Sequence, residues 1–181
     1  MVEAVGRVFV AVPLPPEIKL ALIDQLEDVD IPGKLVPPEN WHLTVRFLGS
    51  VDQITYERFL HGVGQVETQN RFSIRLRGLG GFPKTSKATV VWAGIAEGLE
   101  GLAQLNEIAE SAAQSASLKA EERPYRSHLT LSRVRPPTGV GHLSDTKLDL
   151  RWTCTEVVVY RSHLVTGGTR YQPLERLVLA R

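Results

Sequence analysis

Apolar residues fall into short blocks along the chain, and Pro and Gly residues separate the blocks. Strand-like blocks cover residues 7–12, 41–48, 72–76, 88–95, 125–134, 156–162 and 171–180. Apolar positions at helical spacing instead predict a helix from about Pro16, a second helix capped by Asp52, and a third over residues 99–117. The pattern therefore predicts a chain of mixed strands and helices.

The order of these elements repeats once along the chain. Residues 9–12, a helix and His42-Leu43-Thr44-Val45 match residues 91–94, a helix and His128-Leu129-Thr130-Leu131, at offsets of 82 and 86 residues. Solenoid repeats have periods of up to roughly 50 residues, so this is a different kind of repeat. It predicts an α+β fold of two β-α-β-β lobes related by a pseudo-two-fold axis, in one bilobal domain over residues 1–181.

Composition narrows the class of protein. The chain has 181 residues, 21 Lys and Arg against 20 Asp and Glu, and a net charge of +1, which argues against coating long nucleic acids. Cys154 is the only cysteine, so an internal disulfide and a Cys-rich zinc site are excluded. Apolar stretches are far shorter than the ~18 residues of a membrane span, and the N-terminus does not resemble a secretory signal. We expect a cytoplasmic, monomeric protein that does not enter a membrane.

Each copy of the repeated motif predicts a strand with one apolar and one polar face. Side chains two positions apart share a face, so His42, Thr44 and Arg46 point the same way. The corresponding set in the second copy is Arg126, His128, Thr130 and Ser132. A single strand of this kind is most often an ordinary amphipathic strand at the surface. Two copies in matching places of a repeat favour two polar faces that meet in one cleft.

Two histidines and two threonines in one cleft suit chemistry at a phosphodiester. Imidazole has an ordinary pKa of about 6.5, so one ring can take a proton from a nucleophile while the other gives one to a leaving oxygen. Threonine hydroxyls can donate to the non-bridging phosphate oxygens, and Arg126 or Arg46 would add positive charge. The residues indicate metal-free opening or closing of a phosphodiester.

The motifs and their flanks resemble those of the two-histidine (2H) phosphoesterase superfamily. Residues 37–49, PPENWHLTVRFLG, and residues 125–134, YRSHLTLSRV, are similar to segments of the bacterial and archaeal RNA 2′,3′-cyclic phosphodiesterases, historically called 2′-5′ RNA ligases. The resemblance extends over essentially the whole chain. One departure is Ser127, where proline is common in the family.

The resemblance implies two lobes, each with an antiparallel sheet and outer helices, around a central cleft. It also implies that RNA 2′,3′-cyclic phosphate ends are hydrolysed to 2′-phosphates without a metal or other cofactor. His42 would protonate the departing O3′ and His128 would activate water, while Thr44 and Thr130 hold the phosphate. Arg126 is predicted as a further phosphate contact because it shares the face of His128. Strict alternation turns Arg133 away from the cleft, although it is familiar in the family pattern.

Alternative functions use the same residues. A 2′-5′ RNA ligase would run the reverse reaction, and a non-catalytic binder of RNA ends would need the Thr and Arg contacts but not both imidazoles. A metallo-hydrolase would use His42 and His128 as ligands and needs a third His or carboxylate at motif spacing, which does not recur. The aromatic residues that either stack a base or belong to the core are Phe9, Trp92, Tyr125 and Tyr160.

Overall fold

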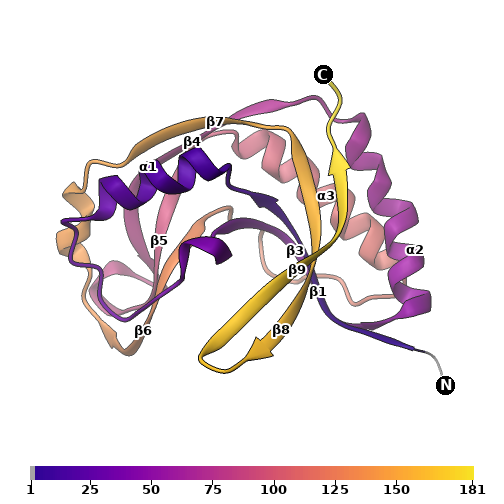
Figure 1. Ribbon diagram of the computed structural model, residues 1–181, viewed down its shortest axis with the longest axis horizontal. Coiled ribbons are helices and arrows are strands. Elements are labelled where there is room, and N and C mark those ends of the chain that lie inside the picture. Colours follow the sequence, from indigo (N-terminus) through magenta and orange to yellow (C-terminus); the bar gives the residue numbers. More distant parts are fainter. Residues whose placement is uncertain (1–2) are drawn as a thin grey trace.

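The computed structural model describes residues 3–181 (Figure 1). The helices over these residues are α1 (Pro16–Leu26), α2 (Gln53–Val63) and α3 (Leu99–Ser115). The strands are β1 (Ala4–Pro13), β2 (Lys34–Leu35), β3 (His42–Asp52), β4 (Phe72–Phe82), β5 (Ala88–Glu97), β6 (Leu129–Thr138), β7 (Asp149–Cys154), β8 (Glu156–Val165) and β9 (Gly168–Val178). The α+β class predicted from the sequence is confirmed.

The strands form one sheet made of two four-stranded halves that meet at β6 and β3. The order is β7-β4-β5-β6-β3-β1-β8-β9, with β2 paired to β6, and all of these pairs are antiparallel. Each strand of the β7-β4-β5-β6 half has a counterpart at the same distance from the centre in the β3-β1-β8-β9 half. The two motif strands β3 and β6 are therefore the central pair. The halves are not continuous in sequence, because β8 and β9 complete the half that begins with β1.

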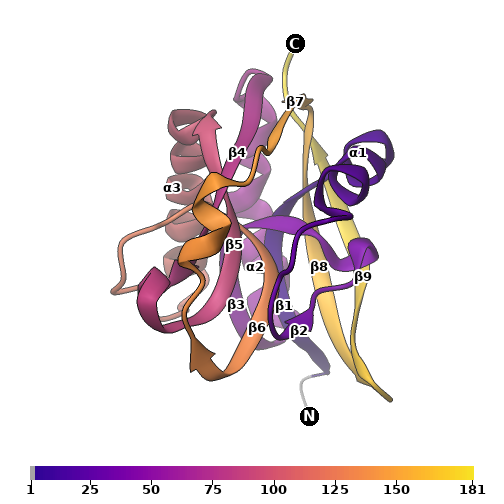
Figure 2. The same ribbon diagram turned by 90° about the vertical axis from the view of Figure 1, so that its left-hand side faces the viewer.

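Helices α1 and α3 each contact the half of the sheet opposite to the one from which they follow. Helix α1 follows β1, yet the side-chain amide of Gln25 donates to the carbonyl of Asp149 in β7 of the other half. Helix α3 follows β5, and Asn106 Nδ2 donates to the carbonyl of Val45 in β3 at 2.8 Å. Helices α2 and α3 lie side by side, whereas α1 lies apart from both (Figures 1 and 2). This exchange of helices fixes the two halves relative to each other.

Local signals explain most of the element boundaries. Asp52 caps α2 as predicted, since its carboxylate accepts from the backbone N–H of Thr55 at 2.8 Å. The strand predicted from residue 125 begins only at Leu129 and runs on through Pro136 to Thr138. Proline is tolerated there because β6 pairs with β5 alone at that end, through a register shift between Ala88 and Val90. Strands β2 and β7 were not predicted.

Among residues 3–181, no helix has the length and apolar character needed to cross a membrane.

Candidate active site

The contact between the two motif strands decides where the motif side chains lie. Strands β3 and β6 pair at Leu43 and Leu129, which are fully buried. In an antiparallel register, this pair sets His42 opposite Thr130 and Thr44 opposite His128, with all four side chains on the face away from the leucines. Directly opposite side chains have Cβ atoms about 4.5–5.5 Å apart. The two copies of the motif therefore form one compact polar site.

Both imidazole rings are oriented by a backbone carbonyl two residues earlier. His42 Nδ1 lies 2.8 Å from the carbonyl oxygen of Asn40, and His128 Nδ1 lies 2.7 Å from that of Arg126. A carbonyl can only accept, so Nδ1 carries the proton in each ring and Nε2 is the nitrogen left for chemistry. His42 Nε2 also lies 3.0 Å from Thr44 Oγ1, so the threonine hydroxyl donates to the neutral ring.

Aromatic side chains enclose each imidazole. The centroid of the His42 ring lies 5.0 Å from that of Phe9 and 5.3 Å from that of Tyr171, which meets it edge-on. The centroid of the His128 ring lies 5.0 Å from that of Phe82, in a T-shaped contact. These contacts keep water from much of each ring, which makes the imidazolium form unfavourable.

The histidine pKa values are lowered by this burial. The pKa of His42 is lowered to about 4, chiefly by burial. The hydrogen bond to the Asn40 carbonyl raises this pKa, whereas the charges of His128 and Lys19 lower it. The pKa of His128 is also lowered, chiefly by burial and further by the charge of Arg133, whereas the hydrogen bond to the Arg126 carbonyl raises it. Both rings are therefore neutral near pH 7 when no anion is bound.

A β-bulge after each motif threonine overturns part of the predicted alternation. Ala11 pairs with Thr44 and Val10 with Arg46, while Trp92 pairs with Thr130 and Val91 with Ser132, so each motif strand contains one extra residue. The second residue after each threonine, Arg46 or Ser132, is consequently buried. The third, Phe47 or Arg133, is exposed and returns to the face of the site.

Arg46 is therefore not a phosphate contact, contrary to the sequence prediction. Its side chain is 9% exposed and forms an ion pair with Glu110 of α3. Arg46 Nη2 also donates to the carbonyl of Lys119 at 2.7 Å. Ser132 is likewise turned away from the site, and its hydroxyl donates to the carbonyl of Pro32 at 2.7 Å.

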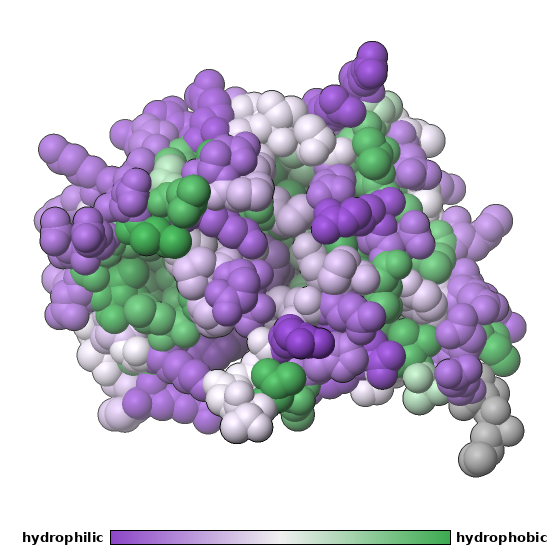
Figure 3. Space-filling model, in the orientation of Figure 1, coloured by the Kyte–Doolittle hydropathy of each residue, from purple (hydrophilic) through white to green (hydrophobic). Residues whose placement is uncertain are grey.

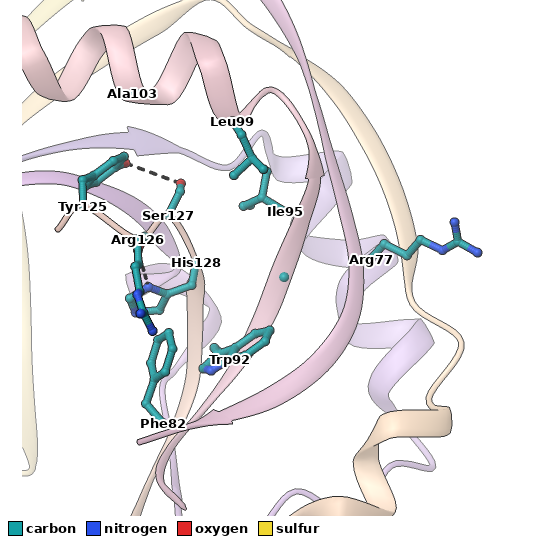
Figure 4. A pocket seen from close by; sticks show the side chains of 11 residues that line it. Arg77, Phe82, Trp92, Ile95, Leu99, Ala103, Tyr125, Arg126, Ser127 and His128 are labelled. Carbon is teal, nitrogen blue, oxygen red and sulfur yellow. Dashed lines mark hydrogen bonds between the residues drawn. The ribbon is translucent and has the colours of Figure 1, made fainter. Parts of the chain in front are cut away.

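A cavity of about 590 Å³ opens beside His128 (Figure 4). Arg126, Phe82 and His128 lie close together at one side of it, whereas the Arg77 side chain points away. Its lining is Arg77, Phe82, Trp92, Gly94, Ile95, Leu99, Ala103, Tyr125, Arg126, Ser127 and His128. A Cβ at Gly80 would lie 2.4 Å from the Trp92 ring, so this glycine lets the indole lie flat on the sheet. The face in Figure 3 is hollowed near its middle, where the rim is largely hydrophilic.

The similarity to known proteins is found along the whole chain. Residues 12–92 match the family described as LigT like Phosphoesterase. The RNA 2′,3′-cyclic phosphodiesterase of Escherichia coli is 30% identical over 181 residues, which cover 96% of each chain. The chain belongs to the LigT-like phosphoesterase family. The enzyme of the same name from Thermus thermophilus is 32% identical over 96% of this chain and 90% of its own. The match to that of Aeropyrum pernix, at 32% identity, covers 63% of this chain and 64% of that protein.

Solved structures of the family share the fold described above. The crystal structure of Escherichia coli LigT complexed with 3′-AMP superposes with a TM-score of 0.81 at 30% identity, covering 97% of this chain and 99% of that one. A structure described as a phosphoesterase gives a TM-score of 0.80 at 30% identity, with the same coverage.

The geometry of this LigT-like phosphoesterase brings together the four motif residues predicted from the sequence. His42, His128, Thr44 and Thr130 meet at the centre of the sheet, and Arg126 lines the cavity beside them. In residues 3–181, no three His, Cys, Asp or Glu side chains gather as metal ligands would.

Sequence reasoning missed the other groups around the histidines. Arg133 was excluded by strict alternation, which the bulge in β6 breaks, and its charge acts on both His128 and Tyr171. Tyr171 and Phe82 come from strands outside the motifs, so no motif spacing could reveal them.

Proposed function

We propose that this protein hydrolyses RNA ends that carry a 2′,3′-cyclic phosphate to 2′-phosphomonoesters, with His42 as general acid and His128 as general base. The observation that carries the proposal is the pair of imidazoles whose Nδ1 atoms are held by carbonyls, which leaves the Nε2 atoms to transfer protons. The Thr44 hydroxyl, which donates to His42 Nε2 in the free protein, turns to the phosphate when substrate binds. The names of the relatives support the same reaction.

The cyclic phosphate lies between the two rings in this proposal. The Thr44 and Thr130 hydroxyls donate to its non-bridging oxygens, and Arg126 and Arg133 supply positive charge beside them. Water attacks phosphorus from the His128 side and gives a proton to His128 Nε2. The bond from phosphorus to O3′ breaks on the opposite side, and O3′ takes the proton of His42 Nε2. The product keeps its phosphate on O2′, and solvent returns the two imidazoles to their starting states.

The lowered pKa of His42 makes substrate binding part of the catalytic cycle. With a pKa of about 4, roughly one His42 ring in a thousand is protonated at pH 7 in the free protein. A bound phosphate anion favours imidazolium, and the Asn40 carbonyl stabilises it through Nδ1. Substrate binding therefore increases the protonated fraction of His42, which is the general acid of the reaction.

The alternatives differ in what they require of this site. A ligase would place a 5′-hydroxyl where the water lies, with the same two imidazoles. A protein that only binds RNA ends would gain nothing from two oriented, buried histidines whose charged forms are disfavoured. We also expect the protein to act as a monomer in the cytoplasm, which sedimentation and cell fractionation would test.

The proposal is tested by incubating the protein with an RNA that ends in a 2′,3′-cyclic phosphate, in EDTA, and identifying the product. A 2′-phosphate is expected at an undiminished rate. A 3′-phosphate would overturn the assignment of O3′ as leaving group, and activity that requires added metal would overturn metal-free catalysis. No hydrolysis by folded protein would overturn the reaction itself.

A further inference from the structure

The spacing between the two catalytic histidines is not fixed by strand pairing alone. Among residues 3–181, strands β3 and β6 share one register pair, Leu43 with Leu129. The segment before β6, residues 118–128, is neither helix nor strand. This segment carries the Arg126 carbonyl that orients the ring of His128. The position of His128 relative to β3 therefore depends on how the end of this segment is attached to β3.

The hydroxyl of Tyr125 provides such an attachment. It donates to the backbone carbonyl of Thr44 in β3 at 2.9 Å. Tyr125 directly precedes Arg126, whose carbonyl holds the ring of His128, and Thr44 follows His42 in the same motif. One hydrogen bond therefore joins the segment that orients one imidazole to the strand that carries the other.

The surroundings of the Tyr125 hydroxyl keep it a donor. A phenol has one proton, which goes to the nearer acceptor, the Thr44 carbonyl. The hydroxyl of Ser127 lies 3.4 Å from the phenolic oxygen and donates to it, and Figure 4 shows these two side chains facing each other in the cavity wall. The pKa of Tyr125 is raised, chiefly by burial, and the contact with Ser127 offsets this only in part. The hydroxyl is therefore protonated near pH 7.

Other contacts to the same stretch of β3 come from parts of the chain further from His128. Asn106 of α3 donates to the carbonyl of Val45, and Arg46 donates to the carbonyl of Lys119 at the start of the segment. These bonds hold α3 and the beginning of the segment against β3. The end of the segment, next to His128, is held by Tyr125.

We propose that the Tyr125 hydroxyl is a positioning group for the reaction, because it sets the spacing between His42 and His128. It acts through the carbonyls of Thr44 and Arg126 and does not touch the reacting atoms. The inference rests on the proposed function, in which both imidazoles act on one phosphate. Spacing matters there, since a misplacement of about 1 Å can lower a rate by about 100-fold.

The first test is the variant Tyr125→Phe, which removes the hydroxyl and keeps the ring in the cavity wall. We expect kcat to fall by about tenfold, because the loosened segment still carries all of its catalytic groups. KM should stay within about twofold, because the phosphate contacts are unchanged. The matched control is Tyr56→Phe in α2, another half-buried tyrosine, which should change neither constant. A kcat of Tyr125→Phe within about twofold of wild type overturns the proposal.

A second measurement separates positioning from stability. If the hydroxyl acts by placing His128, its removal matters only while that imidazole is present. In the His128→Ala background, Tyr125→Phe should therefore lower the single-turnover rate by less than about twofold. The rates are compared at a temperature at which circular dichroism shows every variant folded. An equal loss of about tenfold in both backgrounds would indicate general damage to the fold, and the proposal would be wrong.

NMR titration of the His128 ring signals tests the same contact without a substrate. Loss of the hydrogen bond should let water reach the ring, so the pKa of His128 should rise in Tyr125→Phe and stay unchanged in Tyr56→Phe. If the wild-type protein hydrolyses no 2′,3′-cyclic phosphate, the reaction is wrong, and this titration alone decides on the hydroxyl. A pKa of His128 in Tyr125→Phe equal to that in wild type then overturns the positioning role.

Discussion

Acid should destabilise this protein partly through His42, and the variant His42→Gln should remove that part. The ring has a pKa of about 4 when folded against about 6.5 when unfolded, because burial disfavours its charged form. The folded state therefore holds fewer protons than the unfolded state between these values. The stability from the neutral ring is complete above pH 6.5 and is lost as the pH falls towards 4.

The size of the effect follows from the two pKa values. A pKa of about 4 against about 6.5 corresponds to roughly 3 kcal/mol in full, most of which is lost by pH 4.5. The measurement is urea denaturation of the wild-type protein and of His42→Gln at pH 7.5 and at pH 4.5. The difference between their free energies of unfolding should shift by about 2–3 kcal/mol in favour of the variant at the lower pH.

A control and a second observable make this result specific to His42. The exposed His61 provides the matched variant, His61→Gln, which should follow the wild-type protein at both pH values. NMR titration of the histidine ring signals should show one ring with a pKa near 4 that moves upwards when inorganic phosphate is added. If wild type and His42→Gln lose equal stability with acid, burial does not lower the pKa of the His42 ring.

Three further predictions concern the site and its support. His42→Ala and His128→Ala should each lower kcat by roughly 10²–10⁴, with the double variant little worse than either, while Thr130→Ala should cost about 1–3 kcal/mol in kcat/KM. Arg133→Gln should raise the pKa of His128, because a lowering charge is lost; NMR titration of the His128 ring signals measures the change, and an unmoved pKa contradicts this. Arg46→Met should lower the free energy of unfolding by about 1–3 kcal/mol, because it removes the ion pair with Glu110 and the hydrogen bond to the Lys119 carbonyl; an unchanged free energy would contradict these contacts.

The sequence predicted what depends on local pattern and on the repeat. Alternation and breakers placed most strands, Asp52 was correctly expected to cap a helix, and the repeat anticipated that β3 and β6 present their motifs to one site. These features depend on neighbours in sequence or on the near identity of two segments.

The features that the sequence did not predict depend on backbone register between distant strands. One extra residue after Thr44 and after Thr130 reverses the alternation, which buries Arg46 and exposes Arg133. Nothing in the sequence marks a bulge, because the residues there are ordinary strand formers. The two-residue strand at Lys34 exists only because Gly33 can approach β6 closely. One glycine in the sequence does not indicate which distant strand it will contact.

In the proposed reaction, His42 gives a proton to O3′ while His128 takes one from water. It is tested most directly with an RNA whose cyclic phosphate has sulfur in place of O3′, because a thiolate leaves without help from an acid. We predict that this substrate restores most of the activity lost in His42→Ala and none of that lost in His128→Ala, measured in single-turnover reactions. Equal rescue of both variants, or rescue of His128→Ala alone, would contradict the assigned roles.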